Sequence, residues 1–247
     1  MEPGTNVLNL VIQCSAGVFW TIAYLLMIRK GNRDLTYAMP LAALGANISW
    51  EALYAFIIPP PHPDPTTWVA QVTVNAVWFI FDLLLVWQAL RYGPKEFPGI
   101  ARAAFFGTFA GVTVLAFGTV VMVNVAFDDR YGVHAGLGQN VMMSALFLAM
   151  LQARRSSRGQ SVGIAVTKML GTLCAGGGAW LYPATEELGQ AVLVPYLTLV
   201  CLLLDLAYLV GLLIVRRRER ATRPTDVPTS PEESFDDRTA DELPLRS

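Results

Sequence analysis

Charged residues are scarce in this chain of 247 residues, of which only 15% are Asp, Glu, Lys or Arg, whereas an average soluble domain has about 25%. The deficit is sharper in the first 215 positions, because residues 216–247 hold 15 of the charged side chains. The remainder is too little polar surface to cover a water-soluble globule of this length. The composition therefore argues against a soluble enzyme, and a formal net charge of −1 argues against a polyanionic partner such as a nucleic acid.

Metal-binding and nucleophilic motifs are missing as well. The three cysteines lie within apolar segments and lack metal-ligand spacing, so we expect neither a disulfide framework nor a metal site. The chain has two histidines, no Gly-x-Ser-x-Gly motif and no phosphate-binding loop. No lysine in the last apolar segment could hold a retinal, and Lys168 is placed near the cytoplasmic end of the sixth. We therefore expect no metal and no cofactor.

The first 215 residues contain long runs of apolar side chains with few charged residues. The mean hydropathy is +0.45, and a bilayer core of about 30 Å needs about 20 apolar residues per helix. Strands are excluded because the runs lack the alternation of a membrane barrel. We predict an all-α membrane protein with seven transmembrane helices in a domain of residues 1–215, followed by a disordered cytoplasmic tail of residues 216–247. The seven segments are 6–28, 36–58, 68–91, 102–127, 132–153, 162–183 and 191–215.

The basic residues predict the orientation of these helices. Of the 18 Lys and Arg residues, 17 fall on one side of the predicted topology and only Arg130 falls on the other. Basic loops stay on the cytoplasmic side of a membrane. The N-terminus is therefore predicted outside and the C-terminus in the cytoplasm. The segment 128–132 (DDRYG) begins like an aspartate-rich motif for diphosphate and magnesium, but it lacks a third carboxylate and is predicted to cap or end a helix.

Three carboxylates interrupt the apolar segments and are the candidate catalytic residues: Glu51, Asp82 and Asp205. An acidic residue within a membrane costs a few kcal/mol and marks a functional site by default. A purely structural role, in hydrogen bonds between helices, is the alternative. Each carboxylate has polar or aromatic neighbours at helical spacing, which are the candidate substrate-binding residues: Asn47, Trp50, Tyr54, Trp78 and Tyr208.

A buried carboxyl has a chemistry of its own. An apolar interior disfavours the charged form, and a neutral carboxyl can act as a general acid. Where several carboxyls surround one cavity, one can stay ionised and balance a cation. Aromatic side chains in the same segments either pack in the membrane or stabilise a transient carbocation through their π-faces. Composition alone does not separate these two roles.

Several segments of the chain resemble a known family. They are similar to the small integral-membrane terpene cyclases of fungal meroterpenoid and paxilline-type indole-diterpene pathways and to their bacterial relatives. The likeness extends from about residue 36 to residue 215. The segments that carry it are residues 36–39 (TYAM), 47–54 (NISWEALY), 93–96 (GPKE), 158–161 (RGQS) and 170–172 (LGT), together with Asp205 and Tyr208.

The resemblance implies an enzyme of isomerase or lyase type that needs neither a metal nor loss of diphosphate. Such an enzyme starts cyclisation by protonating a terminal alkene or an epoxide of a prenyl chain on an indole or other meroterpenoid acceptor. The two critical acids of the family match Glu51 and Asp205, whereas the assignment of Asp82 rests on its expected burial. A proton-coupled transporter of a small hydrophobic molecule is the alternative, because buried carboxyls also relay protons.

The expected partners and location follow from the same resemblance. The partners are the lipid bilayer, a substrate with a farnesyl or geranylgeranyl chain, and an upstream prenyltransferase. As a multi-pass protein, the chain is expected in the cell membrane of a bacterium or the endoplasmic reticulum of a fungus. The ring pattern of the product, the terminating base and the oligomeric state stay open.

Overall fold

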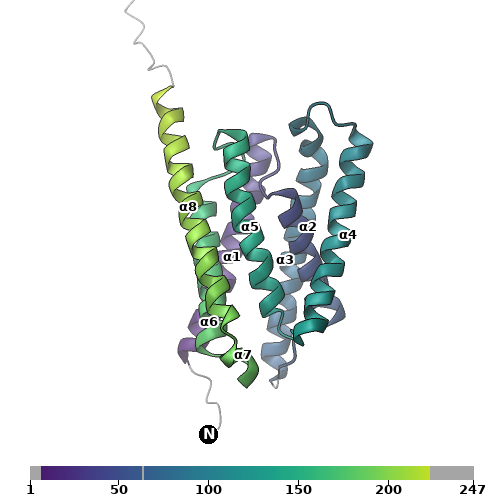
Figure 1. The fold of residues 1–247 in the computed structure, drawn as a ribbon, viewed down its shortest axis with the longest axis vertical. Coiled ribbons are helices and arrows are strands. Elements are labelled where there is room, and N and C mark those ends of the chain that lie inside the picture. The colour runs from purple at the N-terminus through teal and green to yellow at the C-terminus, as the bar shows by residue number, and fades with distance from the viewer. Residues whose placement is uncertain (1–6, 63, 223–247) are drawn as a thin grey trace, which may run out of the picture.

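The computed structural model describes residues 7–62 and 64–222, which form helices and connecting turns without any strand (Figure 1). The all-α fold is confirmed for this part of the chain. The elements in order are α1 (Val7–Asp34), α2 (Leu41–Ala52), the π-helical turn η1 (Leu53–Ile57), α3 (Pro65–Tyr92), the 3-10 turn η2 (Gly93–Glu96), α4 (Arg102–Phe127), α5 (Val133–Arg154), α6 (Val162–Leu181), α7 (Glu186–Gln190) and α8 (Leu193–Ala221).

Six of the described helices are long and apolar enough to cross a bilayer, namely α1, α3, α4, α5, α6 and α8. Their outward faces carry large apolar side chains, as at Val114, Leu115 and Leu203. A soluble protein does not leave such a continuous apolar surface in water. The chain is an integral, multi-pass membrane protein.

The second predicted segment is shorter than expected. Residues 36–40 form a turn instead of helix, and α2 begins only after Pro40, whose ring and missing N–H do not fit a helix interior. At the other end the backbone continues as η1, and Pro59 follows directly on Ile58. The apolar helix Leu41–Ile57 is thus below the length of the other six.

Local sequence explains where several helices begin and end. Asp64 caps α3 by accepting a hydrogen bond from the backbone N–H of Thr67 at 2.8 Å, with Pro65 in the first turn. In the predicted capping segment, Asp129 accepts hydrogen bonds from the backbone N–H groups of His134 and Ala135 at 3.1 and 2.8 Å. Asp129 therefore caps α5, as its motif predicts.

The helices form two groups that meet along α5 (Figure 1). In one group α1 packs on α6, and α8 packs on both α5 and α6. In the other group α2 packs between α3 and α4. Contacts of α1 with α3 and of α2 with α5 join the groups. At Gly171 of α6, an added Cβ would lie only 2.7 Å from Cδ1 of Trp20, so the small residue lets α1 and α6 approach closely.

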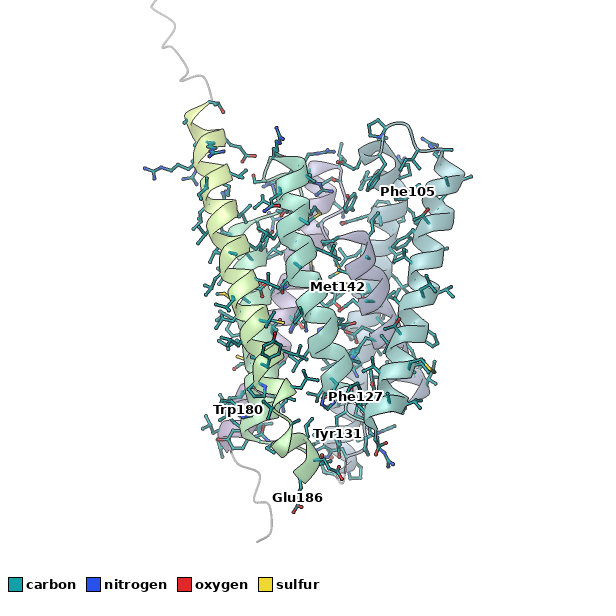
Figure 2. The ribbon with its side chains drawn as sticks, viewed as in Figure 1. Phe105, Phe127, Tyr131, Met142, Trp180 and Glu186 are labelled. Carbon is teal, nitrogen blue, oxygen red and sulfur yellow. The ribbon has the colours of Figure 1, made fainter. Side chains whose placement is uncertain are left out.

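The bundle has a basic end and an opposite end. We call basic the end where α1, α3, α5 and α8 finish with arginines in their last turns. Figure 2 shows Phe105 near the basic end, Met142 midway along α5, and Tyr131 and Glu186 at the opposite end.

The final helix continues past the predicted domain boundary. Residues 216–221 extend α8 as helix, and Glu219 accepts hydrogen bonds from the backbone N–H and hydroxyl of Ser157 at 2.7 and 2.6 Å. A side-chain anchor of this kind gives the first part of the predicted tail a fixed place beside the α5–α6 turn. Residues 223–247, the rest of that tail, lie outside the described residues.

Candidate functional site

A buried polar cluster lies where α1, α2, α3 and α5 meet. Asn47 of α2 is at its centre and donates from Nδ2 to Oδ2 of Asp82 on α3 at 2.8 Å. The same amide donates to the hydroxyl of Tyr24 on α1, and its oxygen accepts from Nε2 of Gln139 on α5 at 3.3 Å. The side chains of Tyr24 and Asp82 are fully enclosed. We call Tyr24, Asn47, Glu51, Asp82 and Gln139 the Asn47 cluster.

Glu51 belongs to this cluster by position. It lies one helical turn beyond Asn47 on the same face of α2, and it is close enough to Asp82 for their charges to interact. The side chain is 3% exposed, and no hydrogen-bond partner lies within reach of its Oε2 atom among the described residues. An unpaired carboxylate is expensive to bury, and two adjacent carboxyls rarely ionise together. The arrangement favours a neutral carboxyl at this position.

Aromatic rings surround the Asn47 cluster on the side of α1 and α3. The ring centroid of Tyr24 lies 6.2 Å from that of Trp78, 5.6 Å from that of Phe81 and 6.4 Å from that of Trp20. Trp78 is fixed by a hydrogen bond from Nε1 to Oγ1 of Thr21 at 3.1 Å. The π-faces of such rings attract cations. Tyr24 is the central ring of this wall, although the sequence did not single it out.

Trp50 and Tyr54 have partners elsewhere. Nε1 of Trp50 donates to the carbonyl oxygen of Gly132 at 3.0 Å, and the Tyr54 hydroxyl donates to the carbonyl oxygen of Asp129 at 2.9 Å. Asn124 donates to the same hydroxyl at 3.0 Å. Their polar atoms therefore hold α2 against the turn between α4 and α5, and do not join the carboxyls.

A second buried cluster contains the third predicted acid. Asp205 of α8 pairs through Oδ1 with Nζ of Lys168 on α6 at 2.7 Å, and Lys168 also donates to Oγ of Ser144 on α5 at 2.7 Å. Tyr208 lies one turn along α8, with its ring centroid 5.4 Å from that of Phe147. No described hydrogen bond or ion pair links this group to Glu51.

Lys168 lies in the second turn of α6, near the end of the segment at which the sequence placed it, and its side chain is fully buried. A lysine inside an apolar segment is costly to bury unless an acidic side chain pairs with it. The position of Lys168 in the sequence could therefore have indicated a buried acid such as Asp205 as its partner. The sequence offered no comparable signal for Ser144 or Gln139, because polar residues of those types occur on any helix.

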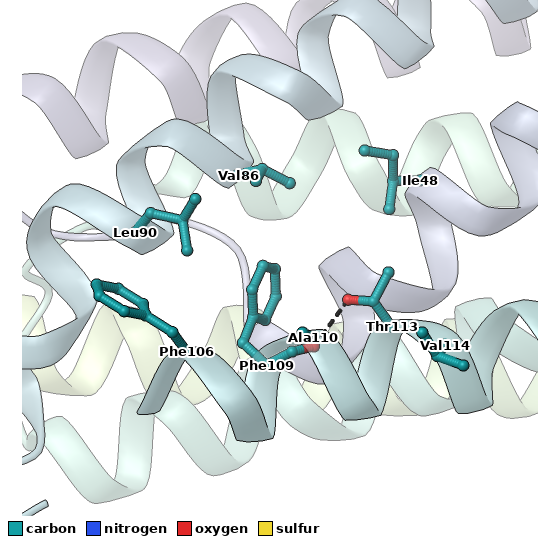
Figure 3. Close-up of a pocket in the computed structure, with 8 residues that line it drawn as sticks. All are labelled: Ile48, Val86, Leu90, Phe106, Phe109, Ala110, Thr113 and Val114. Carbon is teal, nitrogen blue, oxygen red and sulfur yellow. Dashed lines mark hydrogen bonds between the residues drawn. The ribbon is translucent and has the colours of Figure 1, made fainter. Parts of the chain in front are cut away.

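Two of the hollows on the described surface are lined by none of the three predicted acids. The first, of about 600 Å³, is an apolar groove on the outside of α2, α3 and α4 (Figure 3). Its lining includes Ile48 and Val86, each about one turn from an acid of the Asn47 cluster. The second, of about 490 Å³, lies at the basic end between the start of α2 and the end of α5.

Comparison with known proteins decides the family. The profile described as Pyr4-like transmembrane terpene cyclases matches residues 5–218. The chain belongs to this family. It is therefore a membrane terpene cyclase, and the recognition made from the sequence is confirmed. The transporter alternative is not favoured.

Individual relatives agree with this membership. The chain is 30% identical over 210 residues to the Pyr4-family terpene cyclase mfmH of Annulohypoxylon moriforme, covering 80% of this chain and 82% of the relative. It is 30% identical over 223 residues to terpene cyclase pyr4 of Aspergillus fumigatus, covering 84% and 86%. Asnovolin H synthase nvfL of Aspergillus novofumigatus is 28% identical over 168 residues, covering 67% and 66%. No solved structure matches the chain.

Proposed function

We propose that this cyclase starts its reaction with a proton from Glu51. The substrate is a prenyl chain on an indole or other meroterpenoid acceptor, and the proton goes to the terminal alkene or epoxide of that chain. The observation that carries the proposal is the enclosed Oε2 atom of Glu51, which has no partner among the described residues. Asp82 and Asp205 also have one unpartnered buried oxygen each, but their other oxygens are held by Asn47 and Lys168. A neutral carboxyl with a free oxygen is a general acid ready to transfer its proton.

The step balances without a metal or a leaving diphosphate. For an alkene, the Glu51 proton forms a C–H bond at the terminal carbon, and the π-electrons leave a carbocation at the adjacent carbon. Internal alkenes then attack in turn to form rings, and loss of a proton at the end makes the conversion an isomerisation. For an epoxide, the proton goes to oxygen and the C–O bond opens to the same kind of cation.

The other members of the Asn47 cluster orient the acid and the chain. Asn47 holds Asp82 and Tyr24 in place through its amide, so the polar surface beside Glu51 is preorganised. Tyr24 and Trp78 present ring faces to a cation formed nearby. Water is kept out because these side chains are enclosed by packed helices, which delays quenching of the cation.

Asp205 has a positioning role in this mechanism. Its carboxylate is matched by the ammonium group of Lys168, and that pair holds Ser144 of α5. The Asn47 cluster contacts the same helix through Gln139, five residues earlier. Asp205, Lys168 and Tyr208 therefore set the place of α5 against α2, and do not deliver the proton.

The proposal includes the membrane topology. Leu41–Ile57 crosses the bilayer as a short seventh span, so that the N-terminus is outside and the basic end faces the cytoplasm. Its 17 residues cover about 25 Å as helix, which a locally thinned bilayer accommodates.

Product analysis tests the proposed reaction. Membranes containing the protein are given a linear farnesylated indole, and membranes from the same host without the protein are the control. We expect cyclic isomers of unchanged mass only in the presence of the protein. Recovery of unchanged substrate from folded protein, with farnesyl and geranylgeranyl chains and with their terminal epoxides, would contradict the proposal.

A further inference from the structure

The second hollow is a built pocket at the basic end of the bundle. It is lined by Pro40 and Leu41 at the start of α2, by Ala149, Met150 and Ala153 near the end of α5, and by Phe97 after η2. Leu146, Ser156, Arg154, Arg158, Glu96 and Tyr37 complete it. A concave, mostly apolar surface with a few fixed polar groups is typical of small-molecule sites.

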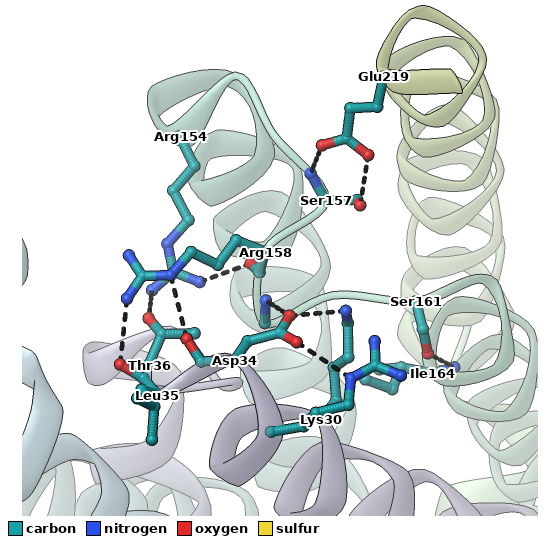
Figure 4. Close-up of polar contacts among 12 residues, drawn as sticks. Lys30, Asp34, Leu35, Thr36, Arg154, Ser157, Arg158, Ser161, Ile164 and Glu219 are labelled. Atoms are coloured by element: carbon teal, nitrogen blue, oxygen red, sulfur yellow. Dashed lines mark hydrogen bonds and ion pairs between the residues drawn. The ribbon is translucent and has the colours of Figure 1, made fainter. Parts of the chain in front are cut away.

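Polar contacts make the rim of this pocket rigid (Figure 4). Arg158 forms an ion pair with Glu96 at 2.6 Å and donates to the carbonyl oxygens of Asp34 and Leu35. Arg154 donates to the carbonyl oxygens of Tyr37 and Arg158 and to the Thr36 hydroxyl, at 3.1, 3.2 and 3.1 Å. The walls therefore exist before any ligand binds, which lowers the entropy cost of binding.

The two arginines of the rim are held by protein acceptors. Arg158 is paired with Glu96, and every nitrogen of its guanidinium group has one protein acceptor. Both terminal nitrogens of Arg154 also have protein acceptors. A guanidinium group has five N–H donors, so each arginine keeps N–H groups that can donate to a polar atom of a ligand.

The walls favour an aromatic ligand. The rings of Tyr37 and Phe97 are nearly parallel, with an interplanar angle of 6° and centroids 6.4 Å apart. The Arg154 guanidinium lies 4.2 Å from the Tyr37 ring centroid and covers one face of that ring, whereas Phe97 is only partly buried. A flat aryl group gains offset stacking on such a wall beyond its burial of apolar area.

The pocket lies in line with the proposed acid. From Leu41 at its edge, α2 runs 10 residues to Glu51, which is about 15 Å along the helix axis. On the facing helix, Leu146 lines the pocket and Gln139 contacts Asn47 about 10 Å deeper. An extended farnesyl or geranylgeranyl chain is long enough to cover this path. The Gln139–Asn47 hydrogen bond, which joins α2 and α5 on this path, is long at 3.3 Å.

We propose that this pocket binds the aromatic head group of the substrate, with the prenyl chain lying along the α2–α5 seam so that its far end reaches Glu51. The inference rests on the proposed function. It accounts for the choice of the chain terminus as the site of protonation, since the head group is held at the far end of the path from the acid.

Equilibrium binding in nanodiscs tests the site separately from catalysis. The probe is a farnesylated indole. Farnesol, which has the same prenyl chain but no aryl head group, is the comparison ligand. The nanodisc lipid is phosphatidylcholine. The pocket is filled by Ala149→Phe or, in a second variant, by Ala153→Phe. Ala207→Phe is the matched control, because Ala207 is an exposed residue of α8 that lines neither hollow.

We expect Ala149→Phe and Ala153→Phe to weaken binding of the farnesylated indole by about tenfold or more, equivalent to about 1.4 kcal/mol. In the same two variants, we expect the affinity for farnesol to change by less than about twofold. In Ala207→Phe, the affinity for either ligand should also change by less than about twofold. Having two filling variants keeps the test decisive if one fails to fold.

Other results would overturn the inference. Equal weakening of indole and farnesol binding would mean that the pocket does not select the head group, and unchanged binding in both filling variants would place the head group elsewhere. Displacement of the indole by phosphatidylglycerol in the nanodisc would identify a lipid head-group site instead. If wild-type protein binds the indole in this pattern but never cyclises it, the site stands and the proposed reaction fails.

Discussion

Lys168 and Asp205 form an ion pair inside the bundle, with 2.7 Å between Nζ and Oδ1 and only 1% of either side chain exposed. The hydroxyl oxygen of Ser144 accepts a second hydrogen bond from the same ammonium group, at 2.7 Å. Because the pair joins α6 to α8 and contacts α5, it ties together three helices that are not all neighbours in sequence. A buried pair of this kind is costly to break from one side, since the remaining charge has no water to solvate it.

The first prediction concerns the stability conferred by this pair. Lys168→Met removes the cation and leaves the Asp205 carboxylate buried alone, which we expect to lower the free energy of unfolding by about 3–5 kcal/mol. Chemical denaturation of the protein in detergent measures the change. The control is Lys95→Met, which removes an exposed lysine and should cost less than about 1 kcal/mol.

The double variant Lys168→Met/Asp205→Asn distinguishes a positioning role of Asp205 from a role of its carboxyl in proton transfer. With both charges gone, we expect stability to return toward wild type, and cyclase activity to exceed that of Asp205→Asn alone. If the double variant is stable but as inactive as Asp205→Asn, the carboxyl of Asp205 takes part in the chemistry, and its assigned positioning role is wrong.

The second prediction concerns the proton donor. Glu51→Gln keeps the size of the side chain but removes its transferable proton, so we expect the rate of cyclisation to fall by about 10²–10⁴-fold. The folded state should lose only about 1 kcal/mol, as expected for an altered hydrogen bond. Single-turnover product formation measures the rate, and thermal unfolding measures the stability.

Asp82→Asn is the matched comparison for Glu51→Gln. The new amide can still accept from Asn47, so we expect a milder loss of activity. Near wild-type turnover by Glu51→Gln would remove Glu51 from the role of donor. An Asp82→Asn variant that is the more severely impaired of the two would transfer that role to Asp82.

The third prediction concerns Tyr54. Its hydroxyl bonds to Asp129 and Asn124 at the α4–α5 turn, so Tyr54→Phe should cost about 1–3 kcal/mol of stability and leave the product ratio unchanged. Tyr196→Phe, at an exposed tyrosine, should leave both stability and products unchanged. A changed product mixture from folded Tyr54→Phe would instead show that the tyrosine contacts the substrate.

The fourth prediction concerns metals. Among the described residues, no group of three or more His, Cys, Asp or Glu side chains converges to hold an ion. The proposed initiator is a carboxylic acid, so cyclisation should proceed at the same rate in EDTA as in added magnesium. Loss of turnover in EDTA that magnesium restores would contradict acid initiation.

The fifth prediction concerns topology. A reporter fused after Ser247 should behave as cytoplasmic and a tag at Glu2 as external, because 17 of the 18 basic residues fall on one side and seven spans are odd in number. If both ends report from the same side, Leu41–Ile57 does not cross the bilayer and only the six long helices do.

The helices were largely predictable because their signals are local. The fourth predicted segment, 102–127, coincides with α4 (Arg102–Phe127), and the fifth and sixth differ from α5 and α6 by no more than two residues at either end. The position of each helix follows from a long apolar run and from the proline, glycine and charged residues that flank it, all of which are close together in the sequence. The start of the second segment was missed by five residues, because Pro40 was included in the span although it ends the turn before α2.

The site was predictable only in part, for a geometric reason. Periodicity places Asn47 and Glu51 on one face of α2, and the cost of burying charge marks Asp82 and Asp205 as unusual. Which side chains of other helices meet those faces depends on how each helix is rotated and shifted against its neighbours. Tyr24 and Gln139 are separated from Asn47 by 23 and 92 residues, and no pattern in either segment reports the meeting.

The sequence by itself thus determined a membrane-embedded helical bundle and the identity of its buried acids, because hydropathy and the cost of burying charge are properties of single segments. Tertiary structure alone decided which acid is free and which is paired. Packing of α6 against α8 brings Lys168 to Asp205, whereas the packing of α2, α3 and α5 leaves Oε2 of Glu51 without a hydrogen-bond partner in the part of the chain that the structure describes. Two carboxyls with the same intrinsic chemistry therefore differ because only one has a buried cation within hydrogen-bonding distance.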